Sequence, residues 1–173
     1  TVRDLLGPDL IAWATHYFCK LPGDGNVVSF HQDASYWGLS PAKAVTAWIA
    51  IDDADEGNGA MQFLPKSHLV GHIPWKETTE NSFLTQQIKE ASAFGPPYSN
   101  ILKAGQFSLH SSLLAHGSPK NNSQRRRCGL TIRYVPPDVI PLDTKYTQKS
   151  YFICGHIESE YWKNNRPPIS DIL

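Results

Sequence analysis

The stretch LLAHGSPKNNSQRRRCGLTIRYV, residues 113–135, contains the pattern that decides the fold of the chain. Two apolar segments, 113–118 and 128–135, lie on either side of a run rich in Asn, Ser and Pro. Short apolar segments separated by turn residues are typical of β-strands. If these two strands pair antiparallel, Arg127 at the start of the second comes back to Ser118 at the end of the first.

The same pattern recurs along the rest of the chain. Further apolar or alternating segments are 10–20, 26–33, 44–51, 59–64 and 105–110. Only TENSFLTQQIKEASA, residues 79–93, has the features of a helix. Seven or eight short strands with one helix predict an antiparallel double-sheet barrel or sandwich, of which a jelly roll is one form. After Pro136 the pattern weakens, which predicts an irregular extension rather than a second domain.

Composition narrows the possible functions. A chain of 173 residues fits one domain, and 16 basic against 16 acidic residues give no field that would attract nucleic acid or an anionic membrane. The 3 cysteines are odd in number and share no CxxC spacing, so we expect neither a disulfide framework nor a zinc ribbon. With no membrane-length apolar run and a terminal SDIL in place of a peroxisomal SKL, the simplest expectation is a reducing cytoplasm.

The tripeptide His31-Gln32-Asp33 is a candidate metal motif. Residues i and i+2 of a strand point to the same side, so His31 and Asp33 can reach one ion. So short a pair recurs by chance, and it gains weight only from His116. Two imidazoles and one carboxylate can hold ferrous iron and leave coordination positions open. A guanidinium and a hydroxyl, from Arg127 and Ser118, suit a carboxylate.

Several neighbours compete for these roles. His110 could replace His116 as the third ligand, and Arg133, which shares strand parity with Arg127, is the rival carboxylate partner. The AHGS context and the 11-residue gap to Arg127 favour His116, and the same spacing favours Arg127. The remaining candidates have structural interpretations: a turn residue for His68, pocket wall or packing for Tyr36 and Trp37, and a hairpin turn for Asn58-Gly59.

Three segments carry a family resemblance: HQD at 31–33, AVTAWIAIDDADEGNGAMQFLPKSH at 44–68, and AHGSPKNNSQRRRCGLTIRY at 115–134. Together they resemble the phytanoyl-CoA dioxygenase family of iron(II)- and 2-oxoglutarate-dependent oxygenases, over roughly residues 4–137. The resemblance implies a mainly β, double-stranded β-helix of jelly-roll, cupin-like type with a few peripheral helices. It also implies one oxygenase domain over 1–173, with a core of about 4–137, an extension of about 138–173, and without the family's usual N-terminal helical region.

The resemblance further implies a role for each site residue. His31, Asp33 and His116 would bind iron(II), Arg127 would pair with the distal carboxylate of 2-oxoglutarate with help from Ser118, and Trp48 would lie near this cosubstrate. By pattern alone Trp48 is a core aromatic. The implied reaction uses dioxygen to hydroxylate a small organic substrate, with release of succinate and CO2. Because Asp33 occupies the carboxylate position that iron halogenases leave to a small residue, hydroxylation is favoured over chlorination.

Two other classes of protein remain open at this point. One is a non-catalytic jelly-roll protein that binds a small molecule in the barrel. The other is a cupin-like metalloenzyme that does not use 2-oxoglutarate, in which Arg127 and Ser118 would have no task. The sequence predicts neither the primary substrate nor the oligomeric state.

Overall fold

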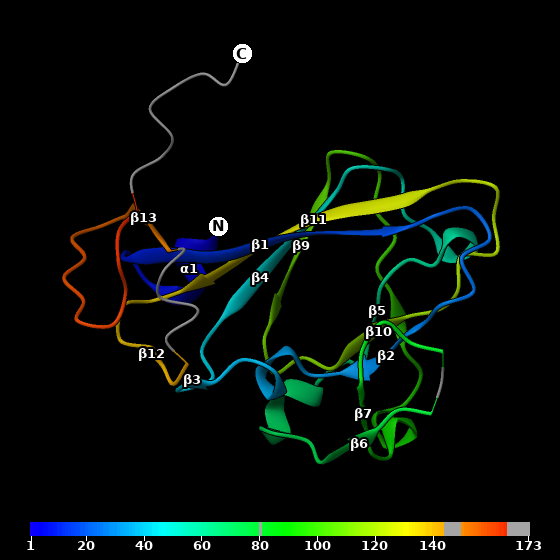
Figure 1. Ribbon diagram of the computed structural model, residues 1–173, viewed down its shortest axis with the longest axis horizontal. Helices are drawn as coiled ribbons and strands as arrows, with labels where there is room; N and C mark the ends of the chain where they lie inside the picture. Colours follow the sequence, from blue (N-terminus) through cyan, green and yellow to red (C-terminus); the bar gives the residue numbers. More distant parts are fainter. Residues whose placement is uncertain (80, 144–149, 166–173) are drawn as a thin grey trace.

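The computed structural model describes residues 1–79, 81–143 and 150–165. Its short strands form two facing antiparallel sheets (Figure 1). The larger sheet has the strand order β13-β1-β11-β4-β9 and the smaller sheet has the order β2-β10-β5-β8, while β12-β3 and β6-β7 form separate pairs. The fold is therefore the mainly β jelly roll that the sequence predicts.

Two sheets, two separate strand pairs and five short helical pieces make up the described part of the chain. The strands of the larger sheet are β1 (Leu10–Lys20), β4 (Val45–Ala50), β9 (Phe107–Ser111), β11 (Arg127–Val135) and β13 (Tyr151–Cys154). Those of the smaller sheet are β2 (Val28–His31), β5 (Gln62–Phe63), β8 (Tyr98–Ser99) and β10 (His116–Ser118). The separate pairs are β3 (Leu39–Ser40) with β12 (Ile140–Pro141) and β6 (Trp75–Glu77) with β7 (Gln86–Ile88). The helical pieces are α1 (Val2–Leu6), η1 (Asp33–Ser35), η2 (Glu56–Asn58), η3 (Ser67–Val70) and η4 (Ala91–Phe94).

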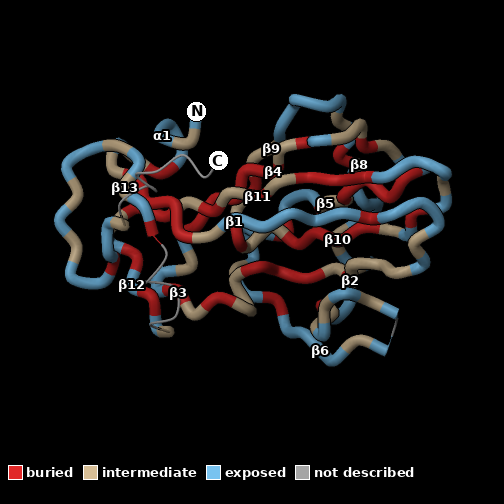
Figure 2. Tube along the Cα trace, turned by 45° about the horizontal axis from the view of Figure 1, so that its top comes forward, coloured by how far each residue is buried: buried red, intermediate tan, exposed pale blue. Residues whose placement is uncertain are grey.

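Strand β11 lies at the centre of the larger sheet, between β1 and β4. Its register places Thr131 opposite His16 of β1 and Trp48 of β4. Because side chains alternate along a strand, Arg127, Thr131 and Arg133 share one face, and all three line the same cavity. Figure 2 shows the buried segments of the two sheets facing each other. The inner face of β11 therefore carries both candidate arginines.

The helix predicted for residues 79–93 is wrong. Within the described part of this segment the chain forms β7 and the short 3-10 helix η4, and β7 pairs with β6. The N–H of Phe83 donates to the Val27 carbonyl at 3.1 Å, which holds the segment against the chain that enters β2. Tertiary hydrogen bonds of this kind override a modest helix propensity.

The conditional pairing of segment 113–118 with 127–135 is also wrong. β10 pairs with β2 and β5 in the smaller sheet, whereas β11 pairs with β1 and β4 in the larger one. Residues 119–126 therefore cross from one sheet to the other. Arg127 still reaches Ser118, because it faces Ser118 across the space between the two sheets.

Asn58-Gly59 does not form a hairpin turn, because β4 and β5 belong to different sheets. The pair instead ends η2, whose first turn is capped by the Asp55 side chain, which accepts from the N–H groups of Gly57 and Asn58. Gly59 has a φ of 79°, and a Cβ there would lie 2.8 Å from the Pro119 carbonyl oxygen. Glycine is required here by conformation and by the close approach of the 119–120 backbone.

The expectation that the cysteines form no disulfide is wrong as well. Cys19 of β1 lies directly opposite Cys128 of β11, and the two are joined by a disulfide. Sequence spacing could not show this, because the two residues are 109 positions apart and meet only through the β1–β11 register. Cysteine usage therefore no longer supports a reducing compartment.

Reduction of this bond is expected to lower the free energy of unfolding by about 2–4 kcal/mol, because the link closes a long loop in the unfolded chain. Urea unfolding with and without a thiol reductant measures the effect. The variant Cys154→Ser, which changes the free cysteine, serves as the control for thiol chemistry elsewhere. Equal urea midpoints for oxidised and reduced protein would contradict the expectation.

The chain after Pro136 is more ordered than its pattern predicts. β13 adds to the larger sheet beside the first residues of β1, with Ala12 opposite Tyr151. Trp162 is buried, and its indole N–H donates to the Val139 carbonyl at 2.7 Å. The described part of the extension is thus packed against the barrel. Among the described residues, no helix is long and apolar enough to cross a membrane.

Candidate metal and cosubstrate site

His31 and Asp33 meet at the end of β2. The strand ends at His31, and Asp33 begins the 3-10 helix η1, so the simple i, i+2 strand geometry is not what joins them. Both side chains are nevertheless buried and face the same cavity. Nε2 of His31 lies 3.6 Å from Oδ1 of Asp33.

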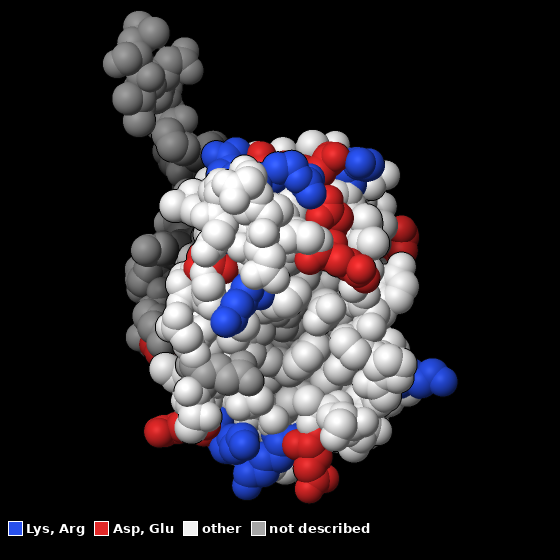
Figure 3. Space-filling view, turned by 90° about the vertical axis from the view of Figure 1, so that its right-hand side faces the viewer, with Lys and Arg blue, Asp and Glu red and all other residues white. Residues whose placement is uncertain are grey.

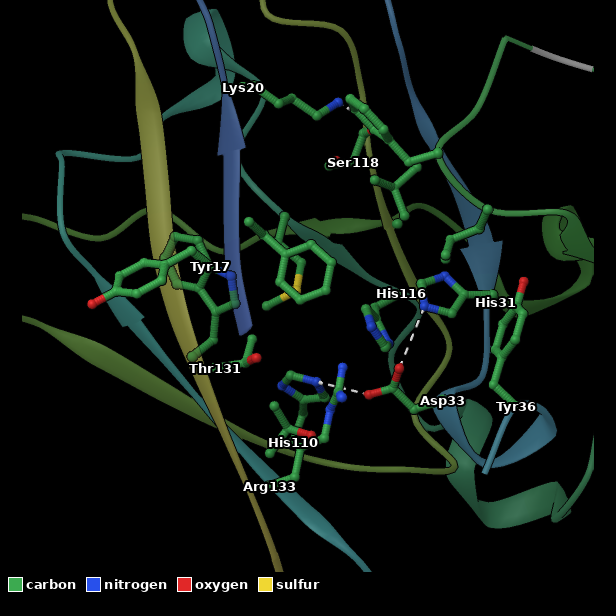
Figure 4. Close-up of a pocket in the computed structure, with 18 of the residues that line it drawn as sticks. Tyr17, Lys20, His31, Asp33, Tyr36, His110, His116, Ser118, Thr131 and Arg133 are labelled. Carbon is green, nitrogen blue, oxygen red and sulfur yellow. Dashed lines mark hydrogen bonds and ion pairs between the residues drawn. The ribbon is translucent and has the colours of Figure 1, made fainter. Parts of the chain in front are cut away.

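His116 completes the cluster from the neighbouring strand. β10 pairs with β2, and the register places His116 directly opposite His31, with ring centroids 4.3 Å apart. One ligand atom from each of His31, Asp33 and His116 lies within 4.8 Å of the others. Figure 4 shows these three side chains directed toward one another. The structure thus brings together the three residues that the sequence predicts as metal ligands.

The hydrogen bonds of the two imidazoles prepare them to bind a cation. Nδ1 of His31 donates to the Ser29 carbonyl, and Nδ1 of His116 donates to the Leu114 carbonyl, each at 2.9 Å. A carbonyl can only accept, so Nδ1 carries the proton and Nε2 keeps a lone pair. Burial, followed by the charge of His31, lowers the pKa of His116 to about 3. At neutral pH the His116 ring is therefore uncharged, the form in which an imidazole can bind a metal ion.

Asp33 supplies the negative charge of the cluster. Burial by itself would raise the pKa of Asp33, but the neighbouring histidines, His116 first, outweigh it and hold this pKa well below its ordinary value. The carboxylate is therefore ionised at neutral pH. A buried carboxylate beside two imidazoles is a donor set that suits a divalent transition metal with open positions.

His110, the rival third ligand, lies just outside this cluster. It is buried, its Nε2 lies 3.9 Å from Oδ2 of Asp33, and its ring centroid lies 4.7 Å from that of His116. Neither of its ring nitrogens has a hydrogen-bond partner among the described residues. Burial lowers the pKa of His110 to about 4. The geometry favours His116 as the ligand and places His110 beside it.

Arg127, Ser118 and Trp48 form a second group in the same cavity. Nη2 of Arg127 donates to Oγ of Ser118 at 3.4 Å, and the guanidinium carbon lies 5.7 Å from the centre of the Trp48 ring. Arg127 is buried, which lowers its pKa to about 10, and its Nε has no hydrogen-bond partner in the described part of the chain. A buried guanidinium with an orphaned donor and a long hydroxyl contact fits a carboxylate ligand.

Arg133, the rival carboxylate partner, lies in a different part of the cavity. Its guanidinium carbon is 4.6 Å from the ring centre of Trp37 and 5.8 Å from that of Trp13, and its Nη1 donates to Nδ1 of His16 at 3.0 Å. The hydroxyl partner that the sequence predicts for the carboxylate site, Ser118, bonds Arg127 instead. The structure therefore favours Arg127 for that role.

Both groups line one cavity of about 510 Å³ between the two sheets. Tyr36 and Trp37, for which the sequence allows either a wall or a packing role, have both roles. They line the cavity. The Tyr36 hydroxyl also accepts from the Gln86 N–H at 2.9 Å, and Trp37 belongs to a buried core cluster. His68 is exposed within η3, in keeping with a turn role. Figure 3 shows the end of the molecule near the loops after β1 and before β11, which is hollowed; most side chains around the hollow are uncharged, and charged side chains of both signs lie at its edge.

The chain is similar in sequence to a known enzyme family and to several of its curated members. The family model described as phytanoyl-CoA dioxygenase matches residues 1–129. The chain belongs to the phytanoyl-CoA dioxygenase family. Among its relatives are phytanoyl-CoA dioxygenase domain-containing protein 1 of Bos taurus and a probable alpha-ketoglutarate-dependent hypophosphite dioxygenase of Stutzerimonas stutzeri. Each is 32% identical, over 69% and 70% of this chain and 43% and 44% of the relative, respectively. The chain thus spans less than half the length of these curated relatives.

The fold of the chain is also similar to the folds of solved non-heme enzymes. The non-heme monooxygenase ThoJ has a TM-score of 0.81 and 31% identity, and the match covers 98% of this chain and 62% of ThoJ. The epimerase SnoN, solved with Fe3+ and alpha-ketoglutarate, has a TM-score of 0.68 at 19% identity and supports the fold alone. The similarity in fold to these non-heme enzymes therefore reaches beyond the residues that the family model matches.

Lys20 is a candidate site residue of this family member that the sequence did not single out. It lies opposite Arg127 in the β1–β11 register, lines the cavity and is buried. Its Nζ donates to the carbonyl oxygens of Asn26 at 2.7 Å and Pro119, and burial lowers its pKa to about 8. A lysine at the end of an alternating strand gives no signal in the sequence. The β1–β11 register shows that Lys20 places a second positive charge beside Arg127.

Gly129 makes room for Trp48 in the same site. A Cβ at Gly129 would lie within 2.2 Å of the Trp48 ring, so the indole rests directly on the glycine backbone. We expect Gly129→Ala to displace Trp48 and to lower the free energy of unfolding by about 1–3 kcal/mol, as overpacking does. Urea unfolding measures this, and Gly25→Ala is the matched control because nothing lies near a Cβ there. An unchanged midpoint for the Gly129 variant would contradict the packing described.

Proposed function

We propose that this chain is the catalytic part of a non-haem iron(II)- and 2-oxoglutarate-dependent dioxygenase that hydroxylates a small organic substrate. The observation that carries the proposal is the joint presence of two groups in one cavity. The cluster of His31, Asp33 and His116 is suited to iron(II). Arg127, with its orphaned Nε beside Ser118, is suited to the distal carboxylate of 2-oxoglutarate.

The residues of the chain would divide the work between binding and positioning. Iron(II), 2-oxoglutarate and dioxygen supply the oxidising power, with succinate and CO2 as co-products. Asp33 and the two histidines would hold the metal, while Arg127 and Ser118 would fix the orientation of the cosubstrate and Trp48 would form a wall beside it. The buried walls keep water from the reacting atoms and hold a substrate carbon close to the metal. No acid or base side chain is required.

Hydroxylation is the outcome that we propose among those open to such enzymes. With Asp33 as a metal ligand, its carboxylate would leave no room for the halide that halogenation needs, so halogenation is disfavoured. Relatives of this fold include an epimerase and a carbocyclase, so the product identity is a separate question from 2-oxoglutarate turnover.

The proposal is tested by aerobic incubation of the ferrous protein with 2-oxoglutarate and quantification of succinate. We expect succinate that depends on both iron and dioxygen, even without the primary substrate, and more of it when a true substrate is added. Omission of iron and the surface variant Arg126→Gln, whose guanidinium pairs with Asp52 outside the cavity, are the controls. Absence of succinate from iron-loaded, folded protein across a substrate screen would contradict the proposal.

A further inference from the structure

The charge inside the cavity is unbalanced in favour of cations. Among the described lining residues, Lys20, Arg127 and Arg133 are cationic and only Asp33 is anionic. In the proposed function a divalent metal and a dicarboxylate cosubstrate cancel each other's charge. Asp24, outside the lining, partly offsets the charges of Lys20 and Arg127. A net positive charge therefore remains around the cavity, and a bound anion would balance it.

One of these three cations, Arg133, lies at the end of the cavity that the cosubstrate does not use. Arg127 and Arg133 are six residues apart on one strand, which separates their backbones by about 20 Å. In Figure 4, Lys20 and Ser118 lie at one end of the site, Arg133 and His110 lie at the other, and His116 lies between them. A cosubstrate held by Arg127 and the metal would leave the Arg133 end to a second molecule.

Arg133 is held in place as a recognition group would be. Its guanidinium lies over the Trp37 ring and near Trp13, and Nη1 donates to His16. Stacking on aromatic rings fixes the plane of a guanidinium, and a fixed plane favours bidentate contact with an oxyanion. The charge of Arg133 is also one cause of the lowered pKa of His110, in keeping with a position close to the metal cluster.

The walls around this end are apolar and aromatic. Trp37 packs on the Arg133 guanidinium and Tyr36 lies beside His31, and both residues line the cavity. The cavity volume of about 510 Å³ is large enough for a ring-sized body beside the cosubstrate. An apolar wall next to a guanidinium favours a ligand with a hydrophobic body and a charged end.

We propose that Arg133 recognises the primary substrate and that this substrate carries an oxyanion on an apolar body. This inference rests on the proposed function, since it assigns Arg127 to the cosubstrate. The oxyanion would pair with the Arg133 guanidinium, while the apolar body lies against Tyr36 and Trp37 and is held close to the metal cluster.

The test uses probes that differ in charge and share a body. Calorimetry on the anaerobic ferrous protein saturated with 2-oxoglutarate would compare phenylacetate, benzylphosphonate and the neutral phenylacetamide. We expect at least one anion to bind at least tenfold more tightly than the amide, and added salt to weaken only the anions. A preference for phenylacetate indicates a carboxylate substrate, and a preference for benzylphosphonate indicates a phosphoryl one.

Variants locate the binding. Arg133→Gln is expected to remove the preference for the anion, Arg133→Lys to keep part of it, and the surface control Arg126→Gln to keep all of it. Equal binding of anion and amide by the wild type, no anion binding, or an unchanged preference in a folded Arg133→Gln variant would overturn the inference. If Arg133→Gln does not fold, the inference is tested by the difference between anion and amide binding in the wild type and by the size of that difference in Arg133→Lys.

Failure of this inference is distinguishable from failure of the proposed function. The visible band of the iron–2-oxoglutarate chelate reports the cosubstrate independently of the probes, and Arg133→Gln is expected to leave it intact. If that variant loses the chelate band instead, Arg133 holds the cosubstrate and the inference is wrong. If the wild type gives no chelate band, the proposed function fails, while the probe titrations can still be run without 2-oxoglutarate.

Discussion

Asp33→Ala is expected to reduce 2-oxoglutarate turnover by more than about 100-fold, since changes to groups that only support metal ligands already cost about 10–100-fold. The substitution removes one of the three proposed ligands and the only negative charge of the cluster, where the carboxylate lies 3.6 Å from Nε2 of His31. Two imidazoles alone bind a divalent ion weakly. Succinate formation and the iron retained after gel filtration measure the effect.

The exposed carboxylate Asp53 offers the matched control, because it pairs with Lys103 on the surface. Asp53→Ala should keep both iron and turnover. An Asp33→Ala protein that retains iron and forms succinate at the wild-type rate would show that Asp33 is not a ligand. His110→Ala adds a further comparison: if it loses iron as completely as His116→Ala, the choice of His116 over His110 is wrong.

Arg127→Gln is expected to raise the KM for 2-oxoglutarate by about 30-fold or more, since truncating one partner of a buried, hydrogen-bonded charge pair costs about 2–5 kcal/mol. The guanidinium is buried, and Ser118 is its one hydrogen-bonded side chain among the described residues. In the Arg127→Gln variant, Lys20 would be the remaining cation near the distal carboxylate of 2-oxoglutarate. Succinate formation at varied 2-oxoglutarate concentration gives the KM.

Two arginine variants make this prediction specific. Arg126→Gln, next in sequence but paired with Asp52 at the surface, should leave the KM unchanged. Arg133→Gln should also leave it unchanged if Arg133 faces the primary substrate. A large increase for Arg133→Gln with none for Arg127→Gln would reverse the two assignments.

The candidate site could be predicted because its residues are tied to local motifs. His31 and Asp33 are adjacent in sequence, and His116 and Ser118 lie on one short strand, so their relative positions need little knowledge of the fold. The family resemblance supplied Trp48, which no local pattern distinguishes from a core aromatic. The structure then placed all of these side chains in one cavity.

The features that were missed depend on strand pairing. Cys19 with Cys128 and Lys20 with Arg127 are neighbouring pairs in the β1–β11 register, and each joins residues more than 100 positions apart. The pairing of residues 113–118 with 127–135 failed for the same reason, because the connection crosses between sheets. The helix predicted for 79–93 failed because the β6–β7 pairing and the Val27 contact outweigh local propensity.

The most direct test of the central claim is anaerobic titration of the ferrous protein with 2-oxoglutarate, followed by visible absorption. The joint presence of the metal cluster and Arg127 predicts a saturable charge-transfer band of the bidentate chelate. The band should be lost in Asp33→Ala and should require much more 2-oxoglutarate in Arg127→Gln. Protein shown to contain ferrous iron that gives no band at saturating 2-oxoglutarate would contradict the account.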